Sequence, residues 1–365
     1  MNERLKIAVN TGGGDAPGLN AVIYAVTMAS YRRGWEVYGI HTGYAGLLDT
    51  DEITRLTPEK VVGIVSLGGT ILGTTNKGDP FSMPVKNAVG EIEVRDVSAR
   101  IFSNFKRLGL DILVAIGGDG SLRIANRFAR MGMPVVGVPK TIDNDLASTV
   151  ITFGFDTAVS TSTEAIDKLH STASAHERVM VVEVMGRSAG WIALNSGISG
   201  SADVILIPEI PFRIESVCRK IMDNELHGKR YGIVVVAEGA KAEGGELIHK
   251  GQCEEGRQEA RLGGIGEWVC REICQRISKD ARSLVLGHLQ RGGSPTTFDR
   301  LVALRFGAAA VRFIAEGQRS VMVALRPPNM VAVPLEEAVE KMKSVPLDSD
   351  QILTARDMGI SFGDD

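Results

Sequence analysis

The sequence predicts an α/β protein in which helices cover both faces of a mostly parallel sheet. Short apolar runs rich in β-branched residues alternate with longer helical patterns along the 365 residues. Most of the short runs are continuously apolar, as expected of strands that are buried on both faces. Polar, glycine-rich turns follow several of these runs, and a chain of this length is long enough for two domains.

Strands are expected wherever an apolar run is short and bounded by turn residues. These runs are Leu5–Asn10, Glu36–His41, Ile112–Ile116, Val135–Val138, Val179–Val184, Val204–Ile207, Gly232–Ala237, Ser283–Leu286 and Val321–Leu325. The clearest helical patterns between them are Leu19–Arg33, Leu122–Met131, Ala158–Ser171 and Arg213–Leu226. The stretch Lys241–Gly264 is rich in Gly and Glu and is expected to be a surface excursion, and a crossing between domains is expected near Asn144–Phe155.

Composition and charge argue against several classes of protein. Hydrophobic residues make up 44% and charged residues 23% of the chain, as in ordinary globular proteins. A formal net charge of −3 argues against a broad surface for nucleic acid. No apolar run is long enough to cross a bilayer, and the N-terminus MNERLKIAVN lacks the apolar core of a signal peptide. We therefore expect a cytoplasmic protein that binds neither nucleic acid nor membrane.

The cysteines of the chain are Cys218, Cys253, Cys270 and Cys274. Cys270 and Cys274 would share a helix face, because residues four apart are neighbours there. Two ligands do not make a zinc site, and no His or Cys pair completes one. Buried free thiols are therefore expected.

The first polar turn runs from Thr11 to Gly18 (TGGGDAPG), between a predicted strand and a predicted helix. Consecutive glycines allow backbone N–H groups to approach an anion, and the following helix adds the positive end of its dipole. The spacing is neither G-x-G-x-x-G nor that of a P-loop. A phosphate-binding turn and a tight connection that binds nothing are equally good interpretations of this stretch alone.

The second turn, Gly117–Ser121 (GGDGS), also follows a predicted strand and precedes a predicted helix. Its glycines leave room for a phosphate, and Asp119 offers the hard oxygen ligand that Mg²⁺ prefers. In the alternative interpretation, Asp119 or Ser121 caps the helix. The same short motif occurs in NAD kinases and lipid kinases, so it indicates a nucleoside phosphate more clearly than a particular enzyme.

The third turn, Pro139–Asp145 (PKTIDND), places two carboxylates, Asp143 and Asp145, two residues apart. Carboxylates in turns usually accept hydrogen bonds from the local backbone. A division of labour is the functional alternative: one carboxylate takes a proton from a hydroxyl, the other helps to hold a metal, and Thr141 orients the acceptor. Phosphoryl transfer needs such positioning, charge neutralisation and one proton acceptor.

Together with further segments, these turns resemble the phosphofructokinase family. The segments that carry the resemblance are GGGDAPGLN (12–20), GGDGS (117–121), PKTIDND (139–145), TFGFDTA (152–158), VEVMGRSAGW (182–191) and GHLQRGG (287–293). The resemblance implies two doubly wound, Rossmann-like domains of mostly parallel sheet, with the active site in the cleft between them. It also implies transfer of phosphate to the 1-hydroxyl of fructose 6-phosphate, a step of glycolysis, by a homodimer or homotetramer with shared active sites.

The resemblance also assigns parts of the chain. Residues 1–154 plus about 290–325 would bind the phosphate donor, and 155–289 plus the tail, about 326–365, would bind the sugar phosphate. On the donor side the matching positions are Gly14, Tyr44, Asn76, Lys77, Gly118, Asp119, Gly120, Ser121 and Lys140. Asp143 matches the catalytic base, with Thr141 and Arg187 beside the reacting groups, and Asp119 matches a ligand of Mg²⁺.

The acceptor side is assigned in the same way. The matching positions are Thr141, Asp143, Asp145, Met185, Gly186, Arg187, Glu238, His288 and Arg291, with Arg178 and Arg282 supplied by a neighbouring subunit. Arginine forks suit phosphate oxygens, which agrees with a cationic ring around the 6-phosphate. Taken one at a time, such arginines are more often solvated surface groups.

The chain departs from the family at three places. Asn76 stands where an arginine commonly follows a G-G-T-x-L-G turn, with Lys77 next to it. Tyr24 and Met28 stand where bacterial allosteric members carry two arginines of an effector site. The excursion Lys241–Gly264 and the C-terminal tail exceed the short bacterial enzymes and carry no assigned role.

Two positions report the phosphate donor, and here they disagree. Gly120 is typical of ATP users, which have no aspartate there, whereas Lys140 is typical of pyrophosphate users. An aspartate at position 120 would fill the space of the α-phosphate and repel it, while a lysine only adds positive charge beside a polyphosphate. We therefore expect ATP with Mg²⁺, and keep pyrophosphate as donor, or another acceptor such as sedoheptulose 7-phosphate, as alternatives.

Two readings from other classes are weaker. An NAD-type dehydrogenase would carry G-x-G-x-x-G, which is absent, and would not need so many aspartates near phosphate turns. A catalytically inactive regulatory subunit would have lost Asp143 or Asp119, and both are present.

Overall fold

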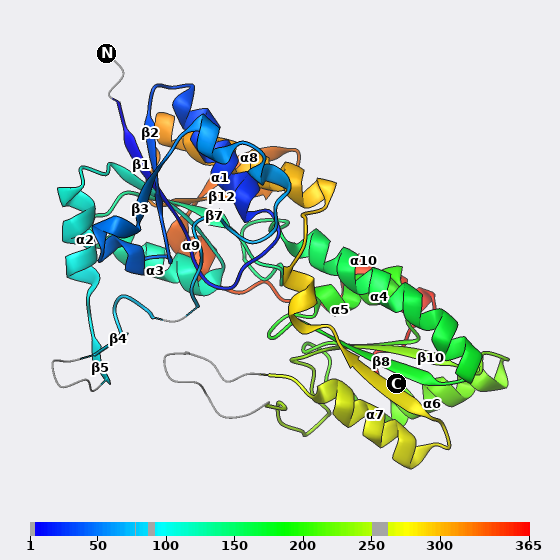
Figure 1. Cartoon of the computed structure of the whole chain (residues 1–365). Coiled ribbons are helices and arrows are strands. Elements are labelled where there is room, and N and C mark those ends of the chain that lie inside the picture. Colours follow the sequence, from blue (N-terminus) through cyan, green and yellow to red (C-terminus); the bar gives the residue numbers. More distant parts are fainter. Residues whose placement is uncertain (1–3, 77, 87–91, 250–261) are drawn as a thin grey trace.

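The computed structural model describes residues 4–76, 78–86, 92–249 and 262–365, which form two α/β domains (Figure 1). The larger domain has a seven-stranded sheet in the order β13-β12-β7-β6-β1-β2-β3, and the smaller has a four-stranded sheet in the order β11-β8-β10-β9. Neighbouring strands of the smaller sheet are all parallel, and only β3 and β13 run antiparallel in the larger one. The predicted fold of two mostly parallel, doubly wound sheets is confirmed.

The strands and helices have the following bounds. The strands are β1 Lys6–Thr11, β2 Glu36–Ile40, β3 Ile53–Leu56, β4 Met83–Lys86, β5 Ile92–Arg95, β6 Ile112–Gly117, β7 Val135–Pro139, β8 Val179–Val184, β9 Val204–Leu206, β10 Gly232–Ala237, β11 Ala281–Val285, β12 Val321–Arg326 and β13 Asn329–Pro334. The α-helices are α1 Leu19–Tyr31, α2 Ser98–Arg107, α3 Asp119–Arg130, α4 Phe155–His176, α5 Trp191–Ser199, α6 Ile214–Leu226, α7 Ile265–Arg276, α8 Thr297–Ala315, α9 Leu335–Glu340 and α10 Asp350–Asp357. Short 3-10 helices are η1 Ala45–Leu47, η2 Thr50–Glu52, η3 Pro58–Val61, η4 Ile64–Ser66 and η5 Gly287–Arg291.

Apolar side chains cover both faces of each sheet. In the larger domain, α1 and α8 pack on one face around Val22 and Phe306, and α2, α3 and α9 pack on the other around Phe105 and Phe128. In the smaller domain, α4, α5 and α10 cover one face and α6 and α7 the other. The continuous apolar runs of the central strands are explained by this two-sided burial.

Every strand predicted from an apolar run is present, but one of them is not buried. β11 is the edge of the smaller sheet, and Leu284 and Val285 are 38% and 39% exposed. Two-sided burial, which was expected of most of the runs, does not hold for this edge strand. The prediction of buried thiols is also wrong in part: Cys218 is buried, Cys270 is partly buried, Cys274 is exposed, and Cys253 lies outside the described residues.

The C-terminal tail divides between the domains. β13 extends the larger sheet and α9 packs against α3, whereas Ile352 and Ala355 of α10 belong to the core of the smaller domain. The chain therefore crosses to the smaller domain after α9, later than the expected position near residue 326. Among the described residues, no helix is long and apolar enough to span a membrane.

A polar joint connects the domains where α4 and α8 begin. The buried carboxylate of Asp299 accepts hydrogen bonds from the backbone N–H and the hydroxyl of Thr157, at 2.7 and 2.6 Å. Thr296 donates to Asp156 at 2.6 Å, and its own N–H donates to the Thr157 hydroxyl at 3.0 Å. Two helix N-termini from different domains are thus satisfied by one shared network, which fixes how the domains meet.

Candidate active site

The three polar turns lie together because β1, β6 and β7 are neighbouring parallel strands of the larger sheet. Their carboxyl ends are at the same edge, and backbone hydrogen bonds link the turns. Gly12 N–H donates to the Ile116 carbonyl at 2.9 Å, and Lys140 N–H donates to the Gly117 carbonyl at 2.9 Å. Ligands of open parallel sheets bind at this edge.

The first turn is held from several directions. Gly13 N–H donates to the Thr75 carbonyl at 3.0 Å, and the Thr74 hydroxyl donates to the Gly13 carbonyl at 2.6 Å. The ammonium of Lys140 donates to the Gly14 carbonyl, and Arg291 donates to the Asp15 carbonyl at 3.0 Å. Arg291 belongs to the chain segment that follows the smaller domain, so it links that segment to the first turn, Thr11–Gly18, which we call the donor turn.

In the second turn, Asp119 is the first residue of α3, whose N-cap position is Gly118 and therefore has no side-chain cap. The two carboxylate oxygens of Asp119 accept from the Arg123 guanidinium, each at 2.9 Å. A Cβ atom added at Gly120 would meet no other atom within 4 Å, so open space lies beside this glycine. That space agrees with the room that the sequence assigned to an α-phosphate.

In the third turn, one oxygen of each of two carboxylates lacks a hydrogen-bond partner. The Oδ1 atoms of Asp143 and Asp145 are buried and accept no hydrogen bond, while Asp143 N–H donates to the Thr141 hydroxyl at 3.1 Å. Burial raises the pKa of Asp143, and the cations of Arg291 and Lys140 act against that shift. Burial and then the Asp143 carboxylate raise the pKa of Asp145. A buried oxygen without a partner indicates that a ligand completes the site.

Lys140 is the cation at the centre of this arrangement. It is 3% exposed, and burial lowers its pKa to about 7, with Arg291 acting in the same direction and the carboxylates of Asp15, Asp143 and Asp145 acting against it. Burial thus disfavours the charged ammonium, and the neighbouring carboxylates favour it.

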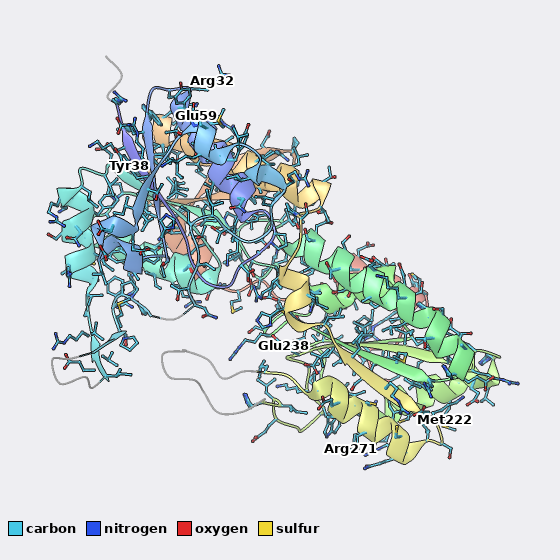
Figure 2. The ribbon with its side chains drawn as sticks, in the orientation of Figure 1. Arg32, Tyr38, Glu59, Met222, Glu238 and Arg271 are labelled. Atoms are coloured by element: carbon cyan, nitrogen blue, oxygen red, sulfur yellow. The ribbon has the colours of Figure 1, made fainter. Side chains whose placement is uncertain are left out.

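The acceptor side is formed by the ends of β8 and β10, which pair in parallel up to Val184 and Ala237. Met185, Gly186 and Arg187 follow β8 and Glu238 follows β10. Figure 2 shows Glu238 at the end of the smaller sheet that faces the larger domain. Gly239 has no alternative, because a Cβ atom there would lie 1.9 Å from the Arg187 carbonyl oxygen.

Electrostatics connects the two sets of strand ends. Burial raises the pKa of Glu238 to about 7, the carboxylates of Asp143 and Glu183 add to the shift, and Arg291 and Arg187 oppose it. Asp143 belongs to the larger domain and Glu238 to the smaller one, so the carboxylate of Asp143 acts on the pKa of Glu238 across the domain boundary.

The segment GHLQRGG forms η5 and its C-terminal flank. His288 is exposed and lines a cavity of about 730 Å³ together with Val285, Leu286, Leu289, Gly292 and Gly293. Arg291, in contrast, faces the donor turn. Sequence reasoning overlooked Gln290, whose buried carbonyl oxygen accepts from the Ser162 hydroxyl at 3.1 Å and from Met185 N–H at 3.3 Å. Its amide thereby ties η5 to the end of β8.

Arg178 and Arg282 lie apart from all these groups. They stand at the amino ends of β8 and β11, so the length of β8, roughly 20 Å at about 3.3 Å per residue, separates Arg178 from Met185. Both guanidiniums pair with Asp280, that of Arg178 at 2.6 Å. Neither can reach the site of its own chain in this conformation.

The remaining positions named from the resemblance are Tyr44, Asn76 and Lys77 on the donor side, and Tyr24 and Met28 at the place of the family's effector site. Tyr44 is 6% exposed, stacks on Phe128 and donates from its hydroxyl to the Ser121 carbonyl at 3.2 Å. Both partners are residues of α3, so Tyr44 packs against this helix. Asn76 is exposed, and Lys77 lies outside the described residues. Tyr24 and Met28 pack against the core of the larger domain, which leaves no cation at that place.

The carboxylates fit a magnesium ion that is shared with a substrate. Within residues 4–76, 78–86, 92–249 and 262–365, no three His, Cys, Asp or Glu side chains form a closed metal site. Asp119 and the unpartnered oxygen of Asp145 each offer a single hard oxygen to a cation. Mg²⁺ usually takes one or two carboxylates and completes its shell with phosphates and water.

The buried carboxyl group of Glu238 predicts a pH-dependent stability. Its pKa is raised from 4.5 to about 7 in the folded protein, so the folded state binds more protons than the unfolded state between these values, and the free energy of unfolding falls as pH rises through this window. Glu238→Gln should therefore raise the free energy of unfolding of the ligand-free protein by about 1–3 kcal/mol at pH 8, and its Tm with it. Below pH 4.5 the substitution should have little effect.

Thermal unfolding of both proteins across this pH range is the measurement. Glu246→Gln, at an exposed position, is the matched control and should show no such trend. A Tm difference for Glu238→Gln that does not change with pH would contradict the assignment.

Comparisons with known proteins agree with this geometry. The sequence pattern of the family described as Phosphofructokinase matches residues 6–314. ATP-dependent 6-phosphofructokinase of Chloroflexus aurantiacus is 51% identical over 364 residues, covering 100% of this chain and 99% of the relative. ATP-dependent 6-phosphofructokinase 1 of Synechocystis is 47% identical over 370 residues and covers 100% of both chains.

Solved structures show the same architecture. The crystal structure of Pichia pastoris phosphofructokinase in the T-state has a TM-score of 0.80 at 32% identity and covers 99% of this chain, which spans only 37% of the yeast chain. Pyrophosphate-dependent phosphofructokinase from Marinobacter aquaeolei shares the fold, with a TM-score of 0.78 at 22% identity over 98% of this chain and 92% of that one. With the family pattern over most of its length and close relatives over all of it, the chain belongs to the phosphofructokinase family.

Proposed function

We propose that the protein transfers the γ-phosphate of ATP to the 1-hydroxyl of fructose 6-phosphate, giving fructose 1,6-bisphosphate and ADP. It is a phosphotransferase of glycolysis, like the relatives named ATP-dependent 6-phosphofructokinase that match its full length. The observation that carries the chemistry is the position of Asp143. Its buried Oδ1 atom has no hydrogen-bond partner, and its carboxylate interacts with the cations of Arg291 and Lys140 and with Glu238.

Asp143 acts as the proton acceptor. The proton of the 1-hydroxyl passes to the Asp143 carboxylate as the 1-hydroxyl oxygen of the sugar forms its bond to the γ-phosphorus. The bond from this phosphorus to the ADP oxygen breaks. A pKa raised by burial makes this carboxylate a better base than a solvated one. The Thr141 hydroxyl, which accepts from Asp143 N–H at 3.1 Å, holds the turn beside the transferred group.

Cations neutralise the phosphates, and carboxyl groups orient the sugar. Lys140 and Arg291 supply positive charge at the first turn, where Gly12–Gly14 bring the backbone close. Glu238 accepts hydrogen bonds from sugar hydroxyls. Arg187 and His288 bind the acceptor substrate, fructose 6-phosphate. Asp119 and Asp145 would hold Mg²⁺ with the ATP phosphates, and the ion would add charge neutralisation at the β- and γ-oxygens.

We further propose that the active sites are shared in a homodimer or homotetramer in the cytoplasm. Arg178 and Arg282 lie about one strand length from the site of their own chain, so in this scheme they bind the 6-phosphate in a neighbouring site. The exposed edge strand β11, with Leu284 and Val285, gives such a neighbour a surface to contact.

Asp143→Asn should lower kcat by about 10²–10⁴-fold, with a much smaller change in KM for fructose 6-phosphate, because positioned proton transfer is lost while shape is kept. Steady-state kinetics with saturating ATP and Mg²⁺ measures both constants. Asp167→Asn, at an exposed position of α4, is the matched control. A near wild-type kcat for Asp143→Asn would rule out the role of general base.

The donor is tested at Gly120. Gly120→Asp should lower kcat/KM for ATP by about 10²-fold, since a carboxylate next to a phosphate costs several kcal/mol. Gly120→Asn fills the same space without the charge and separates the two effects, and Lys140→Gly should keep ATP as donor with a milder loss. The assay compares kcat/KM for ATP and pyrophosphate. If the wild type prefers pyrophosphate, Lys140 and not Gly120 reports the donor.

Shared sites are tested by complementation. Inactive Arg178→Ala chains mixed with inactive Asp143→Ala chains, under conditions that exchange subunits, should recover activity, because one intact site forms in each mixed pair. A mixture of Arg178→Ala and Arg282→Ala should stay inactive, since both changes affect the half that a neighbour supplies. Proven exchange without recovery in the first mixture would mean that each chain builds its own site.

A further inference from the structure

The segment between α9 and α10 runs from one domain to the other directly behind the third turn. α9 packs on α3 in the larger domain, and α10 packs on α5 in the smaller domain (Figure 1). Residues 341–349 connect them. Met342 pairs with Leu146 in an antiparallel bridge, just after the turn that carries Asp143 and Asp145. The segment therefore contacts the chain directly after the third turn, which carries Asp143 and Asp145.

Backbone hydrogen bonds fix this crossing at both ends. Lys343 N–H donates to the Asp145 carbonyl at 2.8 Å, on the side of the larger domain. The indole N–H of Trp191 donates to the Lys343 carbonyl at 3.0 Å, and Val345 N–H donates to Glu209 at 2.8 Å, on the side of the smaller domain. Glu209 also accepts from Gly190 N–H at 3.1 Å, so the same carboxylate holds the start of α5.

The side chain of Lys343 turns back into the loop that follows the catalytic turn. Its ammonium donates to Asn144 Oδ1 at 2.8 Å and to the carbonyls of Thr149 and Val150 at 3.1 and 2.9 Å. These contacts engage all three donors of the ammonium group. The ring of Trp191 lies 5.6 Å from it. A lysine that serves only solubility would extend into water, whereas this one joins three points of a single loop.

The hydrogen bond from Lys343 to Asn144 bears on the catalytic carboxylates. Asn144 stands between Asp143 and Asp145 and has a left-handed backbone, with φ of 51°. Its Oδ1 atom accepts from Thr152 N–H at 3.1 Å as well as from Lys343. A non-glycine residue keeps this conformation only when surrounding contacts stabilise it. The direction of the two carboxylates depends on it, because they are its immediate neighbours.

We propose that Lys343 is a positioning residue for phosphoryl transfer, which holds Asn144 in the left-handed conformation that directs Asp143 and Asp145. The inference rests on the proposed role of Asp143, and it assigns a function to the C-terminal tail that sequence reasoning left unexplained. The tail both joins the domains and sets the geometry of the turn between them. Such second contacts decide whether reacting groups stay within the narrow range that transfer needs.

The test is a double-mutant cycle on kcat with Lys343→Met and Asn144→Ala. Lys343→Met should lower kcat by about 10–100-fold with little change in either KM, since a small misplacement of reacting groups has an effect of this size. Alanine removes the side-chain acceptor and disfavours the left-handed backbone. If Lys343 acts through Asn144, the double variant should be about as slow as the slower single variant. Losses that multiply would contradict the link.

Two controls keep the outcome readable. Lys341→Met removes an exposed lysine two residues away and should leave kcat unchanged, while equal losses from both lysines would overturn the proposal. Should Lys343→Met fail to fold, Asn144→Ala alone still tests the proposal, and an unchanged kcat would overturn it. Asp143→Asn is assayed in parallel: wild-type activity there would refute the proposed base, whereas a slow Asp143→Asn with a fully active Lys343→Met refutes only the present inference.

Discussion

Lys140 and Asp143 share a buried setting at the end of β7, and neither charge is stable there alone. Burial moves the pKa of each towards the neutral form, and each opposes the shift of the other. Arg291 adds a second cation, which favours the carboxylate and disfavours the ammonium. The ligand-free site therefore holds partly compensated charges with unpartnered carboxylate oxygens. In the proposed scheme the sugar 1-hydroxyl and Mg²⁺ would be the partners of these oxygens, and the polyphosphate would pair with the cations.

This balance is maintained by contacts from outside the turn. Asp299 and Thr157 satisfy two helix N-termini at the junction of the domains, and Gln290 ties η5 to the end of β8. Lys343 fixes the other side of the catalytic turn. Each of these groups joins segments that are far apart in the sequence, so the position of Asp143 relative to Glu238 depends on both domains together.

The sequence was informative where a property is local. The runs that became β1, β6 and β7 predicted buried strands, and the glycine-rich turns after them predicted the edge where ligands bind. The ion pair of Asp119 with Arg123 could also have been inferred, because residues four apart on a helix are neighbours. The exposure of β11 could not, since it depends on which strand lies at the edge.

Long-range contacts were also beyond local patterns. Lys343 meets Asn144 across most of the chain, and nothing in its immediate sequence marks it. Arg291 is near His288 in the sequence and ends the same short helix, η5, yet it donates to the Asp15 carbonyl of the first turn while His288 is exposed. The family resemblance names candidate site residues. The three-dimensional structure shows which of these residues lie close together.

A crystal structure with fructose 6-phosphate, Mg²⁺ and a non-hydrolysable ATP analogue tests the central claim most directly. The account predicts a carboxylate oxygen of Asp143 about 2.6–3.2 Å from the 1-hydroxyl oxygen of the sugar, with Lys140 at the donor phosphates and the α-phosphate beside Gly120. A complex in which the 1-hydroxyl contacts Asp145 or Glu238, and no oxygen of Asp143, would contradict it.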